Sequence, residues 1–183
     1  MAQVNVKHLF DGKKGVLVGF PGAFTDGCSE KHLPTYIESA NELFNAGAEI
    51  VAIVAANDGF VMDAWRNASG AKQSAPSLRF LGDSSAELAR ALNLQWSASE
   101  NPFNTDRSQR YSLVIDGGKA RSAEPHSSLD ACTDSALGML PSADQARQRR
   151  ERPWHLRGLS RQQGHRAAKE LRMIAIPPLL YSF

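Results

Sequence analysis

Residues 21–34 have the sequence PGAFTDGCSEKHLP, and they follow the apolar run VLVGF at residues 16–20. A short apolar run of this kind predicts a buried strand. The residues after it predict an amphipathic helix, because apolar side chains recur at the spacing of one helical face. These positions are Leu33, Tyr36, Ile37, Ala40, Leu43 and Phe44. Cys28 is therefore expected where a strand turns into a helix, in the first turn of that helix.

The expected position of Cys28 has a chemical consequence. The first turn of a helix leaves backbone N–H groups unpaired, and the helix dipole favours negative charge there. A cysteine at such a place is favoured as its thiolate, which is the nucleophilic form. The sequence thus predicts a reactive cysteine; the alternative is that Cys28 is a small hydrophobic residue of the core.

Strands and helices alternate along the rest of residues 1–140. Short apolar runs predict further strands at 49–55, 78–81 and 111–115, and a weaker strand is expected after the hairpin turn, at 119–123. Helices are expected at about 57–68, from 84 onward, and at 129–140. Alternation of this kind predicts an α/β fold with a central mixed sheet flanked by helices, and a reactive cysteine after the first such strand favours the thioredoxin-like architecture.

Several local signals define these elements. Pro34 is expected to kink the first helix, because it removes a backbone donor. Asn57 or Asp58 is the expected cap of the second helix, and SSAE at 84–87 has the pattern of a capping box. Gly117 and its neighbouring glycine favour a hairpin turn, whereas 95–106 is expected to be a polar loop.

The charge distribution divides the chain of 183 residues. Residues 1–144 carry 12 basic against 17 acidic side chains, a net charge of −5, whereas residues 145–183 carry 9 against 2, a net charge of +7. We therefore expect a domain at 1–140 and a basic, mostly disordered extension at 141–183. The sequence leaves open whether this extension is genuine or the product of an altered reading frame.

The composition excludes several classes of protein. No apolar run approaches the roughly 18 residues of a membrane span, and the N-terminus lacks the layout of a secretory signal. Two cysteines do not make a disulfide framework, so a reducing compartment is expected, with the cytoplasm as the default. The chain has no glycine-rich phosphate loop and no Cys/His cluster with metal-ligand spacing.

Three motifs resemble one family in the right order. The segment PGAFTDGCSEKHLPTYI at 21–37 resembles the active-site segment of the type II peroxiredoxins, which are thiol peroxidases on a thioredoxin fold. NDGFVMDAW at 57–65 is similar to the second helix of that family, and RSQRYSLVIDGGK at 107–119 matches a later segment. The resemblance covers about residues 4–140. It implies reduction of hydrogen peroxide and organic hydroperoxides without a metal or organic cofactor.

The resemblance also implies a role for each site residue. Cys28 would be the peroxidatic cysteine, whose thiolate attacks the peroxide O–O bond. Thr25 would offer its hydroxyl to the sulfur and to the bound peroxide. Arg110 would supply the cation that favours the thiolate and orients the peroxide. Pro21 would pack over the sulfur and exclude water.

The product of that step would be a sulfenic acid on Cys28, which condenses with a second thiol. EPHSSLDAC, at residues 124–132, resembles the resolving-cysteine segment of the atypical two-cysteine members. The resemblance thus implies a Cys28–Cys132 disulfide that thioredoxin reduces. The alternative is that Cys132 is a bystander and that glutathione or glutaredoxin resolves the sulfenic acid. Family members often pair through the face that bears the active site, which implies a homodimer.

The chain departs from the family in three ways. Asp26 occupies the position of a usual proline, and a carboxylate about 7 Å from the sulfur would cost the thiolate roughly 0.6–2.4 kcal/mol. Arg110 must therefore offset this cost, or Asp26 must face solvent. The segment that usually precedes the VKHLF-like region is lacking, which implies that a pair of edge strands is missing. Nothing after about residue 140 matches.

Other residues have ordinary structural interpretations. His32 is assigned to helix packing or capping rather than to acid–base chemistry, and Arg107 is expected to be solvated. Phe60 and Trp65 are expected in the core. The arginines of the extension suit nucleic acid, but basic tails are common and such binding is not expected. The rival function is a non-catalytic relative that acts as a binding or scaffold protein through this extension.

Overall fold

The computed structural model describes residues 2–125 and 180–182, and the side chains of residues 2–120. Three predictions therefore lie outside the described residues: the helix at 129–140, the location of Cys132, and the disorder of most of the basic extension. The division of the chain at residue 140 falls in the same undescribed part and stays a prediction.

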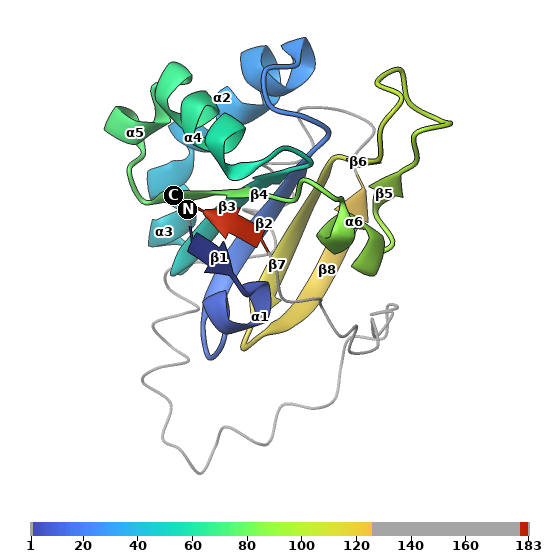
Figure 1. The fold of residues 1–183 in the computed structure, drawn as a ribbon. Coiled ribbons are helices and arrows are strands. Elements are labelled where there is room, and N and C mark those ends of the chain that lie inside the picture. The colour runs from blue at the N-terminus through green and yellow to red at the C-terminus, as the bar shows by residue number, and fades with distance from the viewer. Residues whose placement is uncertain (1, 126–179, 183) are drawn as a thin grey trace, which may run out of the picture.

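A seven-stranded mixed sheet forms the centre of the molecule (Figure 1). The strand order is β1-β9-β4-β3-β2-β7-β8. The strands are β1 Ala2–Val4, β2 Lys14–Phe20, β3 Ile50–Ala55, β4 Leu78–Gly82, β7 Tyr111–Asp116, β8 Lys119–Pro125 and β9 Leu180–Ser182. β2, β3 and β4 are parallel, and β7 runs antiparallel to β2. The predicted strands and the predicted mixed sheet are confirmed.

Helices cover both faces of this sheet. The helical elements are α1 Val6–Leu9, η1 Gly27–His32, α2 Leu33–Glu38, α3 Ala40–Asn45, α4 Gly59–Ala68, α5 Ala71–Ser74 and α6 Glu87–Ala91. Figure 1 shows α2 and α4 on one side of the sheet, with α1 and α6 on the other. The fold therefore needs strands that are apolar on both faces, as β3 (IVAIVA) is.

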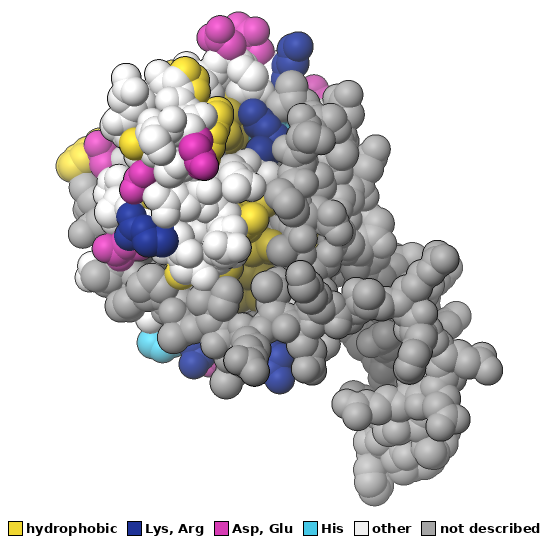
Figure 2. Space-filling view, turned by 90° about the vertical axis from the view of Figure 1, so that its right-hand side faces the viewer, with side chains coloured by type: hydrophobic (Ala, Val, Ile, Leu, Met, Phe, Trp, Pro, Cys, Tyr) yellow, Lys and Arg dark blue, Asp and Glu magenta, His cyan; other side chains and the backbone are white. Residues whose placement is uncertain are grey.

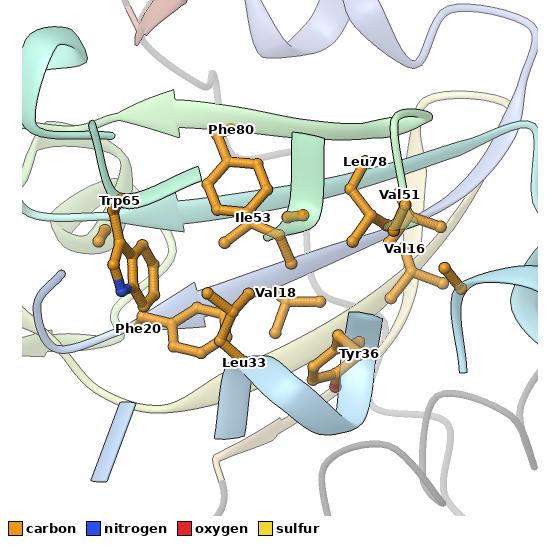
Figure 3. Close-up of a cluster of buried hydrophobic side chains, with 14 of the residues drawn as sticks. Val16, Val18, Phe20, Leu33, Tyr36, Val51, Ile53, Trp65, Leu78 and Phe80 are labelled. Carbon is orange, nitrogen blue, oxygen red and sulfur yellow. The ribbon is translucent and has the colours of Figure 1, made fainter. Parts of the chain in front are cut away.

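Alternate residues of β2 supply the two halves of the core. Val16, Val18 and Phe20 point to the side of α2 and α4, where they pack with the residues drawn in Figure 3. Leu17 points to the opposite side and belongs to the cluster under α1 and α6. This two-residue period is the expected pattern for a strand buried on both faces. Trp65 is in the core as predicted, at 1% exposure.

The helix that carries Cys28 differs from the single kinked helix that the sequence predicts. It begins as a π-helix, η1, in which the Leu33 N–H donates to the Cys28 carbonyl five residues earlier. Pro34 then follows as the second residue of α2, directly after η1, and it has no N–H to donate to a carbonyl of the preceding turn. The helix breaks later, at Ser39, which separates α2 from α3. The predicted kink at Pro34 stays a prediction.

The capping predictions have mixed outcomes. Asp58 caps α4 by accepting from the Val61 N–H at 2.9 Å, as one of the two predicted alternatives. At α6 the predicted capping box is wrong, because the carboxylate of Asp83 accepts from the Leu88 and Ala89 N–H groups. A charged acceptor makes the stronger hydrogen bond, and it displaces the serine hydroxyls from this role.

Two surface features also differ from expectation. Phe60, predicted in the core, is 64% exposed at the start of α4. The stretch predicted as a polar loop, 95–106, begins with a short strand, β5 Gln95–Trp96, which pairs with β6 Arg107–Ser108 directly after it. The predicted hairpin turn is confirmed, since the two glycines between β7 and β8 have φ of +58° and +74°.

The far edge of the sheet holds a strand from each end of the sequence. β9 pairs antiparallel with β1 on one side and with β4 on the other (Figure 1). This edge of the sheet is therefore formed by β1 and β9, next to β4. Residues 180–182 of the predicted extension thus pair with the central sheet.

The described surface mixes charges of both signs. On the face in Figure 2, acidic and basic side chains are interspersed among uncharged ones, and no patch of one sign stands out among the coloured residues. None of the helices in the described ranges is long and apolar enough to cross a membrane.

Candidate active site

Cys28 lies at the predicted strand-to-helix turn, eight residues after the end of β2. It is the second residue of η1, and its side chain is buried, at 1% exposure. Its own N–H and that of Ser29 both donate to the Thr25 carbonyl, at 3.1 and 2.8 Å. These two amides are therefore not aimed at the sulfur, contrary to the expectation for a free helix start. Stabilisation of a thiolate needs another partner.

That partner is Arg110, the residue immediately before β7. Its Nη2 donates to the Cys28 Sγ at 3.7 Å. The sheet register explains the contact, because Tyr111 pairs with Gly19 next to the carboxyl end of β2. Arg110 thus starts its strand beside the point where β2 leads to the cysteine turn. The structure confirms that this cation and this sulfur lie together.

His32 holds the other arm of the same guanidinium. Arg110 Nη1 lies 2.6 Å from His32 Nδ1. A guanidinium only donates, so Nδ1 accepts, and the imidazole in this contact carries its proton at Nε2. The ring is fully buried and packs on Phe20, with 4.1 Å between centroids. The packing interpretation of His32 was thus incomplete, because this residue also orients the active-site arginine.

Thr25 connects the turn to the start of the helix. Its hydroxyl donates to the Gly22 carbonyl at 3.0 Å. Its single hydroxyl proton is thereby engaged, and the oxygen retains lone pairs that can accept a hydrogen bond from a peroxide O–H. The predicted roles of Thr25 toward the sulfur and the peroxide stay predictions.

Pro21 and the residues after it form a loop with its own anchor. Pro21 is buried directly after β2. The Ala23 N–H donates to Asn57 Oδ1 at 2.8 Å, which ties the loop to the residues that follow β3. The next residue, Phe24, has φ +59° and is 53% exposed. The expected packing of Pro21 over the sulfur stays a prediction.

Asp26 does not oppose the site as strongly as its sequence position suggests. Its side chain is exposed and makes no capping hydrogen bond at the start of η1. Solvent screens such a charge, so its repulsion of negative charge at the sulfur is weakened. The sequence required that Arg110 offset the charge of Asp26 or that Asp26 face solvent. Both hold, since Arg110 contacts the sulfur and Asp26 is exposed.

Arg107, expected to be solvated, is instead half-buried beside the same loop. Its Nη1 donates to the Ala56 carbonyl at 3.3 Å, and its guanidinium lies over the Phe103 ring at 5.0 Å. Sequence reasoning missed this residue because its hydrogen-bond partner, the Ala56 carbonyl, is 51 positions away. The motif at 107–119 contains both Arg107 and Arg110, and this closeness to Arg110 is the one sign in the sequence that Arg107 lies near the site.

The chemistry open to this site follows from its composition. Cys28 is a free thiol, and the described residues contain no group of three or more side chains that could hold a metal ion. A buried sulfur beside a fixed cation is suited to act as a nucleophile. Cys132 lies outside the described residues, so its predicted resolving role stays a prediction.

Comparisons with known proteins agree with this chemistry. The Redoxin family model matches residues 1–137. Peroxiredoxin-2E-2, chloroplastic, of Oryza sativa is 40% identical over 138 residues, which are 75% of this chain and 60% of the relative. Peroxiredoxin-2C of the same species is 38% identical over 119 residues, which are 65% of this chain and 71% of the relative. Across the first four curated relatives this chain spans 48% to 64% of their length.

Solved structures show the same likeness in three dimensions. The crystal structure of reduced Prx3 in complex with H2O2 from Vibrio vulnificus has a TM-score of 0.67 at 36% identity, covering 76% of this chain and 90% of that one. Peroxiredoxin 5 from Alvinella pompejana has a TM-score of 0.63 at 30% identity, covering 72% and 81%. The predicted thioredoxin-like architecture is therefore confirmed.

Proposed function

Because this chain belongs to the Redoxin family, and within it to the type II peroxiredoxins, we propose that it is a thiol-dependent peroxidase whose nucleophile is Cys28. The observation that carries the proposal is the 3.7 Å contact between Arg110 Nη2 and the Cys28 sulfur. A guanidinium stays charged at any physiological pH, so it favours the thiolate over the thiol. The substrates are hydrogen peroxide and small organic hydroperoxides.

The reaction at Cys28 transfers one oxygen atom. The thiolate attacks the terminal hydroxyl oxygen of the peroxide; an S–O bond forms and the O–O bond breaks. Sulfur is oxidised by two electrons to the sulfenic acid, and the leaving oxygen takes up a proton to become water or an alcohol. Arg110 stabilises the negative charge that moves toward this leaving oxygen.

Access to the sulfur comes from the side of the loop after β2. Cys28 itself is buried, but Phe24 and Asp26 are exposed and Thr25 is half-buried.

The sulfenic acid is returned to the thiol in two steps. The Cys132 thiol condenses with it, forming a disulfide and releasing water, and a dithiol reductant such as thioredoxin then reduces that disulfide. In the one-cysteine alternative, glutathione or glutaredoxin supplies the resolving thiol. Cys132→Ser distinguishes the two mechanisms, because it stops cycling with thioredoxin only if Cys132 resolves.

The compartment and the assembly are part of the same proposal. The reaction requires reduced thiols, so we place it in a reducing compartment, with the cytoplasm as the default. Phe24 and Phe60 are exposed near the cysteine turn, which suits a homodimer that pairs through this face. Subcellular fractionation tests the first statement, and light scattering of the wild type against Phe60→Glu tests the second.

Peroxide consumption by the reduced full chain tests the central proposal. The wild type should consume one equivalent of hydrogen peroxide rapidly, Cys28→Ser none, and Cys132→Ser one equivalent in a first turnover. Trp65 donates to Ser29, next to the nucleophile, so its fluorescence should report the oxidation. Consumption by Cys28→Ser at the wild-type rate would overturn the proposal, as would a wild type that does not react.

A further inference from the structure

We propose that Arg107 is a positioning residue that holds the loop at residues 22–25 in the geometry needed for reaction with peroxide. This inference rests on the proposed function, because it concerns the same reaction at Cys28. Arg107 belongs to β6, a strand outside the central sheet. It lies 79 positions after Cys28 in the sequence, yet it packs on the loop that precedes the cysteine.

Arg107 connects three segments that are distant in sequence. Its Nη1 donates to the carbonyl of Ala56, just after β3. Its guanidinium lies over the ring of Phe103, in the stretch between β5 and β6. Its third neighbour is the loop after β2, at Gly22. The half-buried guanidinium thus fills the space between this loop and the end of β3.

Gly22 shows how closely the guanidinium approaches the loop. A Cβ placed on Gly22 would lie 3.1 Å from Arg107 Nη1 and 3.3 Å from Thr25 Cγ2. Both distances are tighter than an ordinary carbon contact. Arg107, the Gly22 backbone and Thr25 therefore form one packed unit, which the Thr25 hydroxyl closes by donating to the Gly22 carbonyl.

The role of this unit is steric rather than electrostatic. The Arg107 guanidinium is committed to a carbonyl and an aromatic face, whereas the sulfur receives its cation from Arg110. Loss of Arg107 removes the support behind Thr25 but leaves the charge at the sulfur in place. A misplacement of about 1 Å in a positioning element can cost a reaction on the order of 10²-fold in rate.

Two rate constants at one pH separate positioning from thiolate formation. The first is the stopped-flow rate of Cys28 with hydrogen peroxide, and the second is its alkylation by iodoacetamide, which needs the thiolate but not the placed loop. Arg107→Gln should lower the peroxide rate by about 10- to 100-fold and the alkylation rate by less than about twofold. Arg107→Lys keeps the charge without the planar contacts, so it should recover only part of the lost rate.

Arg66→Gln is the matched control for this substitution. Arg66 also donates from its guanidinium to a backbone carbonyl, that of Pro76 at 2.9 Å, and its Nε is also buried without a partner, as that of Arg107 is. It lies on α4, and the carbonyl that it binds belongs to the segment before β4 rather than to the loop. Both rates should stay within about twofold of the wild type in this variant.

Gly22→Ala tests the same contact from the loop, on the opposite side from Arg107. The new methyl displaces the guanidinium, so the peroxide rate should fall while alkylation is kept. In the Arg107→Ala background, Gly22→Ala should lower the peroxide rate far less, because the guanidinium that the new methyl would meet is absent. Equal costs in the two backgrounds would contradict the proposed contact.

The following results would overturn the inference. A peroxide rate within twofold of the wild type in Arg107→Gln would exclude positioning, and full recovery in Arg107→Lys would assign Arg107 an electrostatic role instead. Equal losses of peroxide and alkylation rates would mean that the variant damages the thiolate itself. Failure of the proposed function is distinguishable, because the wild type would then not react with peroxide.

Discussion

At the scale of single residues, the site depends on how one guanidinium is shared. Arg110 donates from one nitrogen to the Cys28 sulfur and from the other to His32. The buried imidazole prevents the side chain from turning away from the sulfur. Arg110 therefore supplies the positive charge and His32 orients the guanidinium, and a substitution can remove each contribution separately.

Arg110→Gln removes the charge. The variant should alkylate more slowly at pH 7, because less of Cys28 is then a thiolate, and its peroxide rate should fall by at least about 100-fold, the scale measured for one lost oxyanion donor. Stopped-flow and iodoacetamide kinetics on the same sample give both numbers. An Arg110→Gln protein with wild-type alkylation would contradict the assignment of the cation.

His32→Leu removes the orientation. The leucine keeps an apolar contact with Phe20 but cannot accept from the guanidinium, so the peroxide rate should fall by about 10-fold. A purely structural role would instead lower stability alone. Urea unfolding measured beside the peroxide rate separates these results, and a destabilised variant with unchanged peroxide rate would count against positioning by His32.

The residues of the site differed in how predictable they were. Cys28, Thr25 and Arg110 belong to local motifs, and the sequence placed the first and last of these together. His32 and Arg107 act across 78 and 51 positions, to Arg110 and to Ala56. No local pattern encodes such contacts, because they depend on which strand ends meet in the folded sheet.

At the scale of elements, hydrogen bonding determines how two of the helices begin, which the spacing of apolar residues does not predict. The spacing of Leu33 and Tyr36 fits an α-helix, but Pro34 lacks an N–H, and the chain before it winds as a π-helix. At α6 the serines fit the pattern of a capping box, yet the carboxylate of Asp83 accepts the hydrogen bonds from the backbone N–H groups of the first turn. The existence of both helices was predictable from pattern, whereas their first turns were not.

Asp83 makes stability depend on pH. Burial raises the pKa of this carboxyl above its ordinary value, although the backbone hydrogen bonds at α6 oppose the shift. The native state therefore binds the proton more tightly than the unfolded chain does, and stability falls as the pH rises from the ordinary value through the raised one.

Asp83→Asn isolates this contribution, because the amide keeps one acceptor and does not titrate. The free energy of unfolding of the wild type, minus that of the variant, should decrease as the pH rises through this window. Urea unfolding of both proteins at a series of pH values from about 3.5 to 7 gives the difference. A difference that grows with pH would contradict the raised pKa.

At the scale of the whole molecule, the two ends of the chain complete one edge of the sheet. β9 pairs with β1 through three residues and with β4 through Tyr181 and Gly82. The basic composition of residues 141–183 favoured a separate extension, and only long-range strand pairing reveals that its last residues join the domain. Pairing of this kind leaves a weak local signal in three residues of sequence.

Tyr181→Pro tests this edge, because proline cannot donate to either neighbouring strand. The variant should lose about 1–3 kcal/mol of unfolding free energy, the value of a few backbone hydrogen bonds. Tyr181→Thr is the control, since it keeps the N–H and a strand-favouring side chain. Equal urea midpoints for Tyr181→Pro and the wild type would show that β9 contributes nothing to stability.

The reaction of the reduced full chain with hydrogen peroxide, followed by stopped-flow at pH 7, is the most direct measurement of the sulfur–cation pair. We expect a second-order rate for Cys28 that exceeds that of free cysteine by several orders of magnitude, and the loss of most of this advantage in Arg110→Gln. A wild-type rate no higher than that of free cysteine would contradict the role assigned to the sulfur–cation pair.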